Sequence, residues 1–316
     1  MKTVECTIPS EEVARVKGLG FLRDKNTADC FNARVITRNG KLTAEKLKAI
    51  ADASKLFGSG EVTMTTRMTL EIQRIPYSNI DPLREYLAKY DLFTGGTGPK
   101  VRPVVSCKGT TCQYGLIDTF ALSEEIHNRF YEGYSSVKLP HKFKIAVGGC
   151  PNNCAKPDLN DVGIIGQLKP VVNFDACRGC KVCLVEKSCP MKACRVENGK
   201  ITVDESLCNN CGRCKDACHF KAFAEYQNGY KIYIGGRWGK KVARGIPLSK
   251  IFTSKEEVLE MLEKIILLFK DKGIAGERLR DTIERITFET AEALLLSNEL
   301  LERKEEIIEK AVQAKI

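Results

Sequence analysis

Eight cysteines in the middle of the chain form two C-x2-C-x2-C runs, each with one more cysteine nearby. Thiolates are the soft ligands that iron–sulfur clusters take, and this repeat is typical of a segment holding two [4Fe-4S] clusters. In that arrangement the fourth thiolate of each run crosses to the other cluster. The crossing predicts two ligand sets, Cys177, Cys180, Cys183 and Cys218 for one cluster and Cys208, Cys211, Cys214 and Cys189 for the other.

The segment that carries both runs, residues 171–227, is predicted to be an inserted bacterial 2[4Fe-4S] ferredoxin domain. Structural zinc is the weaker alternative, because zinc needs four ligands and leaves the regular third cysteine of each run without a role. Five residues, LVEKS, separate Cys183 from Cys189, and we interpret this unusually long gap as a one-turn bulge. Cys194 falls where an apolar residue normally packs, so we predict that it belongs to the core.

Four further cysteines lie in two close pairs, Cys107 with Cys112 and Cys150 with Cys154. Four thiolates that converge from two glycine-containing loops suit a third cubane cluster. On spacing alone, zinc remains a fair competitor. The residues around the two pairs carry the further information.

The stretches CKGTTCQYGL and LPHKFKIAVGGCPNNC resemble the signature of siroheme-dependent sulfite and nitrite reductases. The downstream GYKIYIGGRWGKK and the inserted ferredoxin segment resemble the compact anaerobic branch of that family. The resemblance implies that Cys107, Cys112, Cys150 and Cys154 hold a [4Fe-4S] cluster, and that Cys154 also bridges to the siroheme iron. The expected cofactors are therefore siroheme and three [4Fe-4S] clusters.

The same resemblance implies roles for two arginines near the start of the chain. In TMTTRMTLEIQRI, Arg67 corresponds to the family arginine that meets siroheme carboxylates, although Met68 replaces the usual glutamine. In FNARVITRNGK, either Arg34 or Arg38 is the substrate arginine. We favour Arg34, because it lies deeper in the strand-like run, whereas Arg38 adjoins the turn residues Asn39-Gly40.

Three more cations complete the pocket that the resemblance implies. Arg102, five residues before the first cluster cysteine, resembles the second substrate arginine, and Lys142 and Lys144 match a lysine pair of the family. Residues i and i+2 of a strand project to the same side, so Lys142 and Lys144 are expected to lie on one face. We expect Arg34 and Arg102 to bind the oxygens of the anion, and the two lysines to supply protons.

The order of strand-like and helical segments predicts an α+β fold. Residues 31–37 and 61–75 read as strands, and residues 43–57 and 78–90 as helices. Ser254 and Glu257 form a capping box for a helix that ends at Lys272-Gly273. A second helix is expected from Asp281, with its continuity left open at TFET. The predicted domains are 1–91, a ferredoxin-like substrate-side domain; 92–170 with 228–253, a siroheme and [4Fe-4S] α/β domain; 171–227, the inserted ferredoxin domain; and 254–316, C-terminal helices.

Composition limits the setting in which this chemistry takes place. Among 316 residues, 15 cysteines and no signal peptide or membrane span indicate a soluble, cytoplasmic metalloprotein. The net charge of +10 is spread along the chain without a nucleic-acid-binding motif, so a small anion is a sufficient partner. No nucleotide-binding G-x-G-x-x-G opens a helix, and the resemblance implies flavin- and iron–sulfur-containing subunits as the electron donor.

The predicted activity is six-electron reduction of sulfite to sulfide. Nitrite reduction to ammonia is one alternative, and an electron-transfer subunit without its own catalysis is another. The chain has one copy of each motif, whereas larger family members carry two copies with the anion-binding residues of one half facing the siroheme of the other. A homodimer or larger assembly with a pocket shared between chains is therefore expected.

Overall fold

The computed structural model describes residues 5–314, which divide into two compact units. Unit 1 contains the described residues up to Ser106, then Ser123–Ile145 and the described residues from Glu263 onward. Unit 2 contains Cys107–Leu122 and Ala146–Leu262. Each unit mixes helices with strands, so the predicted mixture of α and β structure is confirmed. The two units do not correspond one to one with the four predicted domains, so the domain boundaries stay predictions.

An antiparallel sheet in unit 1 has the strand order β1-β2-β4-β3. In β2, Phe31, Ala33 and Val35 are fully buried, while the residues between them are partly exposed, as expected for a strand with one face on the core. Arg34 therefore lies on the face opposite the core. The strand bounds are Phe21–Arg23 for β1, Cys30–Val35 for β2, Val62–Met64 for β3 and Leu70–Pro76 for β4.

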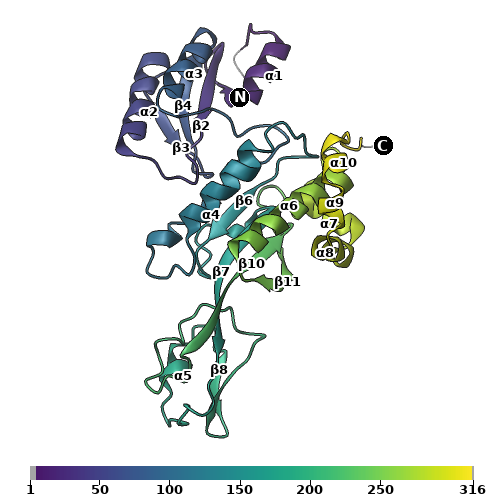
Figure 1. Ribbon diagram of the computed structural model, residues 1–316. Coiled ribbons are helices and arrows are strands. Elements are labelled where there is room, and N and C mark those ends of the chain that lie inside the picture. The colour runs from purple at the N-terminus through teal and green to yellow at the C-terminus, as the bar shows by residue number, and fades with distance from the viewer. Residues whose placement is uncertain (1–4, 315–316) are drawn as a thin grey trace. The chain divides into compact units, whose positions relative to one another are not determined.

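Two helices pack beside each other against this sheet (Figure 1). Helix α2, Ala44–Phe57, begins where the Thr43 side chain accepts a hydrogen bond from the Lys46 N–H at 3.2 Å. The buried residues of α2 fall at helical spacing on one face, and α3, Ile80–Ala88, buries Leu83 and Leu87 in the same core. The shorter α1 spans Ser10–Gly18. The predicted helices over 43–57 and 78–90 are thus confirmed within a few residues.

The single strand predicted over residues 61–75 is wrong, because this segment is a hairpin of β3 and β4. Thr65 and Thr69 close the hairpin with a backbone hydrogen bond of 2.9 Å, and Met68 has a φ of 59°. A residue with positive φ turns the chain even though neither Gly nor Asn marks the turn. Arg67 therefore lies at the tip of a hairpin rather than within a strand.

A second sheet has the order β11-β10-β7-β6-β5. Strands β7 and β10 pair antiparallel in unbroken register, from Val162 opposite Ile234 to Val171 opposite Glu225. Figure 1 shows this ribbon continuing to the segment that contains α5 and β8. The stretch GYKIYI lies within β10. The bounds are Val105–Ser106 for β5, Ile145–Gly148 for β6, Val162–Val171 for β7, Glu225–Ile234 for β10 and Ile246–Phe252 for β11.

The cysteine-rich segment between β7 and β10 has a small core of its own. Val185, Ile201, Ala222 and Phe223 are buried there together with Cys194, which confirms the prediction that Cys194 is a core residue. The five residues between Cys183 and Cys189 form the one-turn helix α5, Leu184–Ser188. The other elements are the paired strands β8, Cys194–Glu197, and β9, Lys200–Val203.

Helix α6, Lys255–Lys272, ends before Gly273 as predicted. The stretch expected to be helical from Asp281 forms four helices among the described residues, and the first break falls at Thr287, which adopts a φ of 70°. No helix among residues 5–314 is long and apolar enough to cross a membrane. The remaining bounds are Thr119–Ile126 for α4, which continues into a π-helical turn His127–Glu132, then Leu279–Ile286 for α7, Phe288–Leu296 for α8, Glu299–Glu302 for α9 and Lys304–Glu309 for α10.

The start of α6 generates a first prediction. The Glu257 N–H donates to the Ser254 hydroxyl at 3.1 Å, as a capping box requires, but the Glu257 carboxylate accepts from the Thr253 N–H at 2.8 Å instead of from Ser254. Losing a cap costs about 1 kcal/mol, so Ser254→Ala should speed amide hydrogen exchange in the first turn of α6 about fivefold. Ser254→Thr keeps the acceptor and should exchange like wild type; equal rates in all three proteins would contradict the capping role.

Candidate functional site

Two cysteine-bearing loops meet in unit 2. The Gly149 N–H donates to the Cys107 Sγ at 3.1 Å, which ties the loop of the first pair to the start of the second. A Cβ on Gly109 would lie 2.8 Å from the Gly149 Cα, so both positions require glycine for the backbones to approach this closely. The close approach brings the two predicted thiol pairs together.

The turn from Cys150 to Cys154, hereafter the cysteine turn, presents one thiol to solvent. Cys154 is exposed, whereas Cys107, Cys112 and Cys150 are half-buried. Burial raises the pKa of the Cys150 thiol, and repulsion from Cys107, Cys154 and Cys112 acts in the same direction. Gathered thiols of this kind release their protons when they bind a metal centre. The donor set therefore fits a cluster with one thiolate accessible to a second group.

The inserted segment gathers a second set of four thiols. A small cavity there is lined by the predicted ligands Cys189, Cys208, Cys211 and Cys214. Burial acts to raise the pKa of Cys189, but backbone N–H groups of Ala193, Cys194 and Met191 outweigh it and lower the pKa. Backbone donors to a ligand sulfur favour its thiolate form and tune a cluster. The structure thus brings together the crossed ligand set expected from the sequence.

The other predicted set is arranged around the core of the same segment. Cys177, Cys183 and Cys218 pack against that core, and the Cys177 Sγ accepts from the Ile201 N–H at 3.3 Å. The fourth member, Cys180, is half-buried. Among residues 5–314, no three His, Cys, Asp or Glu side chains are placed to bind one shared metal ion. A [4Fe-4S] cluster does not require several side chains around one metal ion, because each of its four irons binds its own thiolate.

Two predicted arginines of unit 1 converge on one carbonyl. Arg34 and Arg102 both donate to the Gly96 carbonyl oxygen, Arg34 at 3.3 Å and Arg102 more closely. The Gly96 N–H in turn donates to the Tyr131 hydroxyl at 3.0 Å. Gly96 has a φ of 72°, and a Cβ there would lie 3.0 Å from Pro103, so the clamp depends on glycine.

Of the two arginines, Arg102 has no carboxylate nearby, among the described residues, to balance its charge. Burial lowers its pKa to about 10, and the nearby charge of Arg34 contributes in the same direction. Arg34 also pairs with Glu71 at 3.3 Å, but Arg102 makes no ion pair with any carboxylate of the described chain. The Nε atoms of Arg34 and Arg102 are buried and have no hydrogen-bond partner within residues 5–314. A half-buried pair of cations with buried, unpartnered Nε atoms is suited to bind an anion.

The predicted lysines adjoin the Arg102 segment. Val101 and Phe143 form a parallel bridge, and the Arg102 N–H donates to the Phe143 carbonyl at 2.8 Å. Phe143 is fully buried while Lys142 and Lys144 are half-buried, so the two lysines share the opposite face. The strand expected to carry them begins only at Ile145, because before it the pairing is limited to that bridge. Lys142 and Lys144 therefore share a face because the backbone alternates around Phe143, although this segment is not a regular strand.

Arg67 is held against the same two segments. Its guanidinium donates to the Pro103 carbonyl at 2.7 Å and to the Ile145 carbonyl at 3.2 Å. Unit 1 therefore brings Arg34, Arg67, Arg102 and the lysine pair onto one framework of connected backbone.

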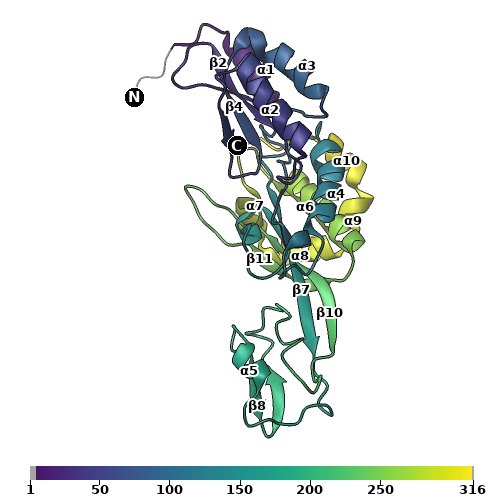
Figure 2. The ribbon, with the colours of Figure 1, turned by 90° about the vertical axis from the view of Figure 1, so that its left-hand side faces the viewer.

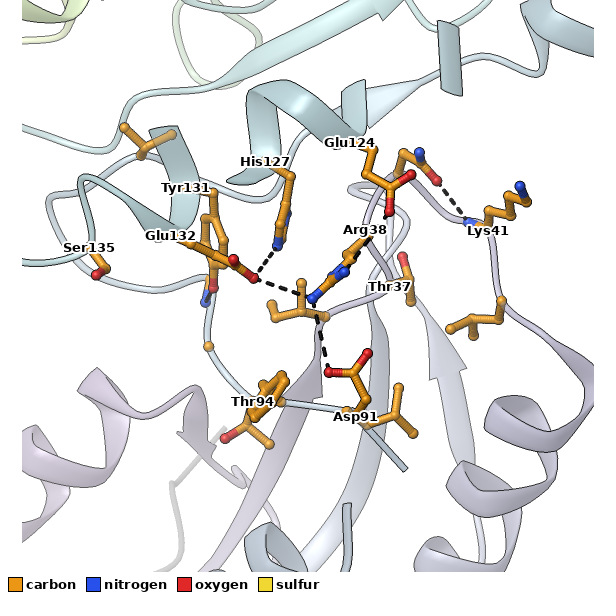
Figure 3. A pocket seen from close by; sticks show the side chains of 18 of the residues that line it. Thr37, Arg38, Lys41, Asp91, Thr94, Glu124, His127, Tyr131, Glu132 and Ser135 are labelled. Atoms are coloured by element: carbon orange, nitrogen blue, oxygen red, sulfur yellow. Dashed lines mark hydrogen bonds and ion pairs between the residues drawn. The ribbon is translucent and has the colours of Figure 1, made fainter. Parts of the chain in front are cut away.

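Arg38, the alternative to Arg34, lines a cavity of about 560 Å³ in unit 1, which Gly96 and Tyr131 also line (Figure 3). Its guanidinium is 3.6 Å from the Glu132 carboxylate, 3.9 Å from that of Glu124 and 4.0 Å from that of Asp91. Figure 3 shows Arg38 pointing toward these three carboxylates. Since its charge is already matched, the geometry favours Arg34 as the anion ligand.

One cation near this framework was missed by sequence reasoning. Arg278, which precedes α7, lowers the pKa of Arg102, although less than burial and Arg34 do. The pKa of His141 is lowered by burial and then by Lys142, Arg278 and Arg102. Nothing in the pattern GERLRD distinguishes Arg278 from a surface residue, so only the tertiary structure could identify it.

Two family descriptions match most of the chain. Residues 97–304 match the family described as the nitrite and sulphite reductase 4Fe-4S domain. Residues 23–90 match the nitrite/sulfite reductase ferredoxin-like half domain. The first range contains all twelve predicted cluster cysteines, and the second contains Arg34 and Arg67.

Two of three curated relatives carry sulfite reductase names. The coenzyme F420-dependent sulfite reductase of Methanocaldococcus jannaschii is 28% identical over 77% of this chain, which spans only 38% of that protein. An uncharacterized protein of the same organism is 32% identical, over 83% of this chain and 89% of its own length. One of the subunits of the anaerobic sulfite reductase of Salmonella typhimurium is 29% identical, over 75% of this chain and 74% of its own length.

Solved structures share the fold. A crystal structure of dissimilatory sulfite reductase I superposes with a TM-score of 0.66 at 21% identity, covering 84% of this chain and 69% of that one. The Mycobacterium tuberculosis NirA protein gives a TM-score of 0.64 at 17% identity, covering 98% of this chain and 49% of that one.

The arginine pair generates a second prediction. Sulfate should raise the thermal unfolding midpoint of the wild type by a few degrees, since about 1 kcal/mol of ligand stabilisation shifts Tm by roughly 2–4 °C. Arg34→Met and Arg102→Met should each lose most of this shift. Because sulfate also stabilises proteins nonspecifically, Arg38→Met is the matched control and should keep the wild-type shift. Equal shifts in all four proteins would contradict an anion site at Arg34 and Arg102.

Proposed function

This chain belongs to the nitrite and sulfite reductase family, and we propose that it reduces sulfite to sulfide at a siroheme coupled to a [4Fe-4S] cluster. As a member of that family it is an oxidoreductase with a 4Fe-4S domain. The observation that carries the proposal is the half-buried arginine pair that shares the Gly96 carbonyl. Sulfite is a small oxyanion, and two convergent guanidinium groups match its charge and its oxygens.

Cys107, Cys112, Cys150 and Cys154 are the proposed ligands of the coupled cluster. Cys154 is the exposed thiol of the four, which suits a sulfur that also reaches a second metal. When bound, siroheme supplies an iron for the substrate sulfur and, with its cluster, a source of electrons. Arg67, a cation fixed by two carbonyls, is proposed to neutralise carboxylates of the macrocycle.

The cations of unit 1 have separate tasks in this mechanism. Arg34 and Arg102 bind the oxygens and offset negative charge as electrons arrive. Reduction of hydrogensulfite to hydrosulfide consumes six electrons and six protons and releases three water molecules. Lys142 and Lys144 are the proposed proton donors, because a lysine among other cations loses its proton more readily, whereas arginine stays charged.

The inserted segment is the proposed route of the electrons. Its two thiol sets would hold two further clusters, making three in all, and these would relay single electrons toward the coupled cluster. The donor is proposed to be a separate flavin- and iron–sulfur-containing subunit. Relatives named as subunits of sulfite reductases support assembly with other chains.

The lysine pair generates the prediction that tests this function. The purified protein should show siroheme absorption and turn over sulfite with a low-potential electron donor. Lys142→Met and Lys144→Met should each lower kcat by at least about 100-fold, because a positioned proton donor contributes about 100- to 10,000-fold to a reaction rate. The siroheme content of both variants should stay unchanged. Lys55→Met, at an exposed position of α2, is the control.

Unchanged kcat in both lysine variants would return these residues to a structural role. Faster turnover of nitrite than of sulfite would favour reduction of nitrite to ammonia. A protein that takes up iron but no siroheme would instead be an electron carrier.

We also propose that the chain works as a homodimer or within a larger assembly in which two copies complete each other's site. Each motif occurs once, and a twofold interface places the same surface of both copies in contact. Mixing inactive Cys154→Ser and Lys142→Met protomers should then restore about one quarter of wild-type activity, because half the protein is heterodimer with one working site. No recovery after subunit exchange would show that each chain builds its pocket alone.

A further inference from the structure

The connection between β10 and β11 is a hairpin with strong positive charge. Arg237 and Ala243 pair in antiparallel fashion through backbone hydrogen bonds of 2.9 and 3.0 Å. Residues 237–244, hereafter the basic hairpin, read RWGKKVAR, with four cations and no acid. Figure 2 shows this green connection extending out from the sheet.

The base of the basic hairpin rests on the residues that follow the cysteine turn. The Gly245 N–H donates to the Asp158 carbonyl at 2.7 Å. A Cβ on Gly236 would lie 2.3 Å from that same carbonyl oxygen, so the two backbones are in direct contact. The buried Asp158 carboxylate accepts from the Asn153 side chain at 2.7 Å and from Arg244. One acid therefore ties the hairpin to the residue next to Cys154.

The tip of the basic hairpin is exposed. Trp238, the sole tryptophan of the chain, is 63% exposed and Val242 is 57% exposed. Lys240 and Lys241 are also exposed, and neither makes an ion pair with any described residue. An uncompensated pair of cations beside an exposed aromatic ring suits a flat ligand with an anionic rim.

We propose that the basic hairpin binds the carboxylate rim of the siroheme whose iron Cys154 reaches. The inference rests on the proposed function and adds a binding surface to it. The anchoring through Asp158 holds the hairpin beside the cysteine turn, Lys240 and Lys241 supply charge opposite to the carboxylates, and Trp238 offers an apolar face to the ring edge. A lysine-rich tip with no acidic neighbours otherwise costs stability through repulsion, which bound carboxylates relieve.

The experiment measures siroheme affinity rather than turnover. Full-length protein that contains its iron–sulfur clusters but lacks siroheme is titrated with siroheme, and binding is followed by visible absorption at several salt concentrations. Exposed charge pairs contribute about 0.2–1 kcal/mol each, so Lys240→Gln/Lys241→Gln should weaken binding roughly 2- to 30-fold. The dependence of affinity on salt should become shallower, because two cation–carboxylate contacts are lost.

Matched variants separate the role of charge from folding. Lys240→Arg/Lys241→Arg keeps the charge and should bind like wild type, as should Lys55→Gln/Lys89→Gln, which removes the same charge from exposed positions of unit 1. Iron content is compared in all proteins. Wild-type affinity and salt dependence in Lys240→Gln/Lys241→Gln would overturn the hairpin's role alone. A wild-type protein that binds no siroheme would overturn the proposed function and the hairpin's role with it.

Discussion

The Gly96 peptide imposes the constraint on which the cationic site depends. Its carbonyl accepts from two guanidinium groups that repel each other, and its N–H is fixed by the Tyr131 hydroxyl. Partial burial of both arginines strengthens their repulsion, and the carbonyl dipole between them offsets part of it. The Arg102 segment then pairs with Phe143, and this pairing sets the position of the flanking lysines.

Much of the candidate site could be predicted because its signals are local. Cysteine spacing identifies ligand runs, since each run must turn tightly around one cluster. The crossed set of Cys189 with Cys208, Cys211 and Cys214 lines one cavity, as the spacing predicts. The choice of Arg34 over Arg38 rested on depth within a strand. The structure adds a reason invisible in the sequence, the three carboxylates around Arg38.

Three features of the site could not be predicted from the sequence. They depend on a turn without Gly or Asn and on contacts between residues far apart in the chain. The strand-like pattern of TMTTRMTLEIQRI gives no sign of the hairpin tip. Met68 takes the positive φ there, whereas Gly or Asn at this position would have marked a turn. Gly96 lies in GGTG, which reads only as a loop until its two arginine partners are known. Arg278 is far along the chain from Arg102, so their electrostatic coupling exists only in the folded protein.

The register of β7 and β10 has a consequence for how the cysteine-rich segment joins the sheet. Val171 and Glu225 face each other as the last pair of the ribbon, so the cysteine-rich segment leaves and re-enters the sheet at neighbouring positions. A segment whose two ends already lie side by side can be inserted into a hairpin, or removed from it, without moving the strands. The cysteine-rich segment therefore joins the sheet as a unit that could be exchanged without disturbing β7 and β10. At this end of the ribbon a simple turn would suffice to connect the two strands.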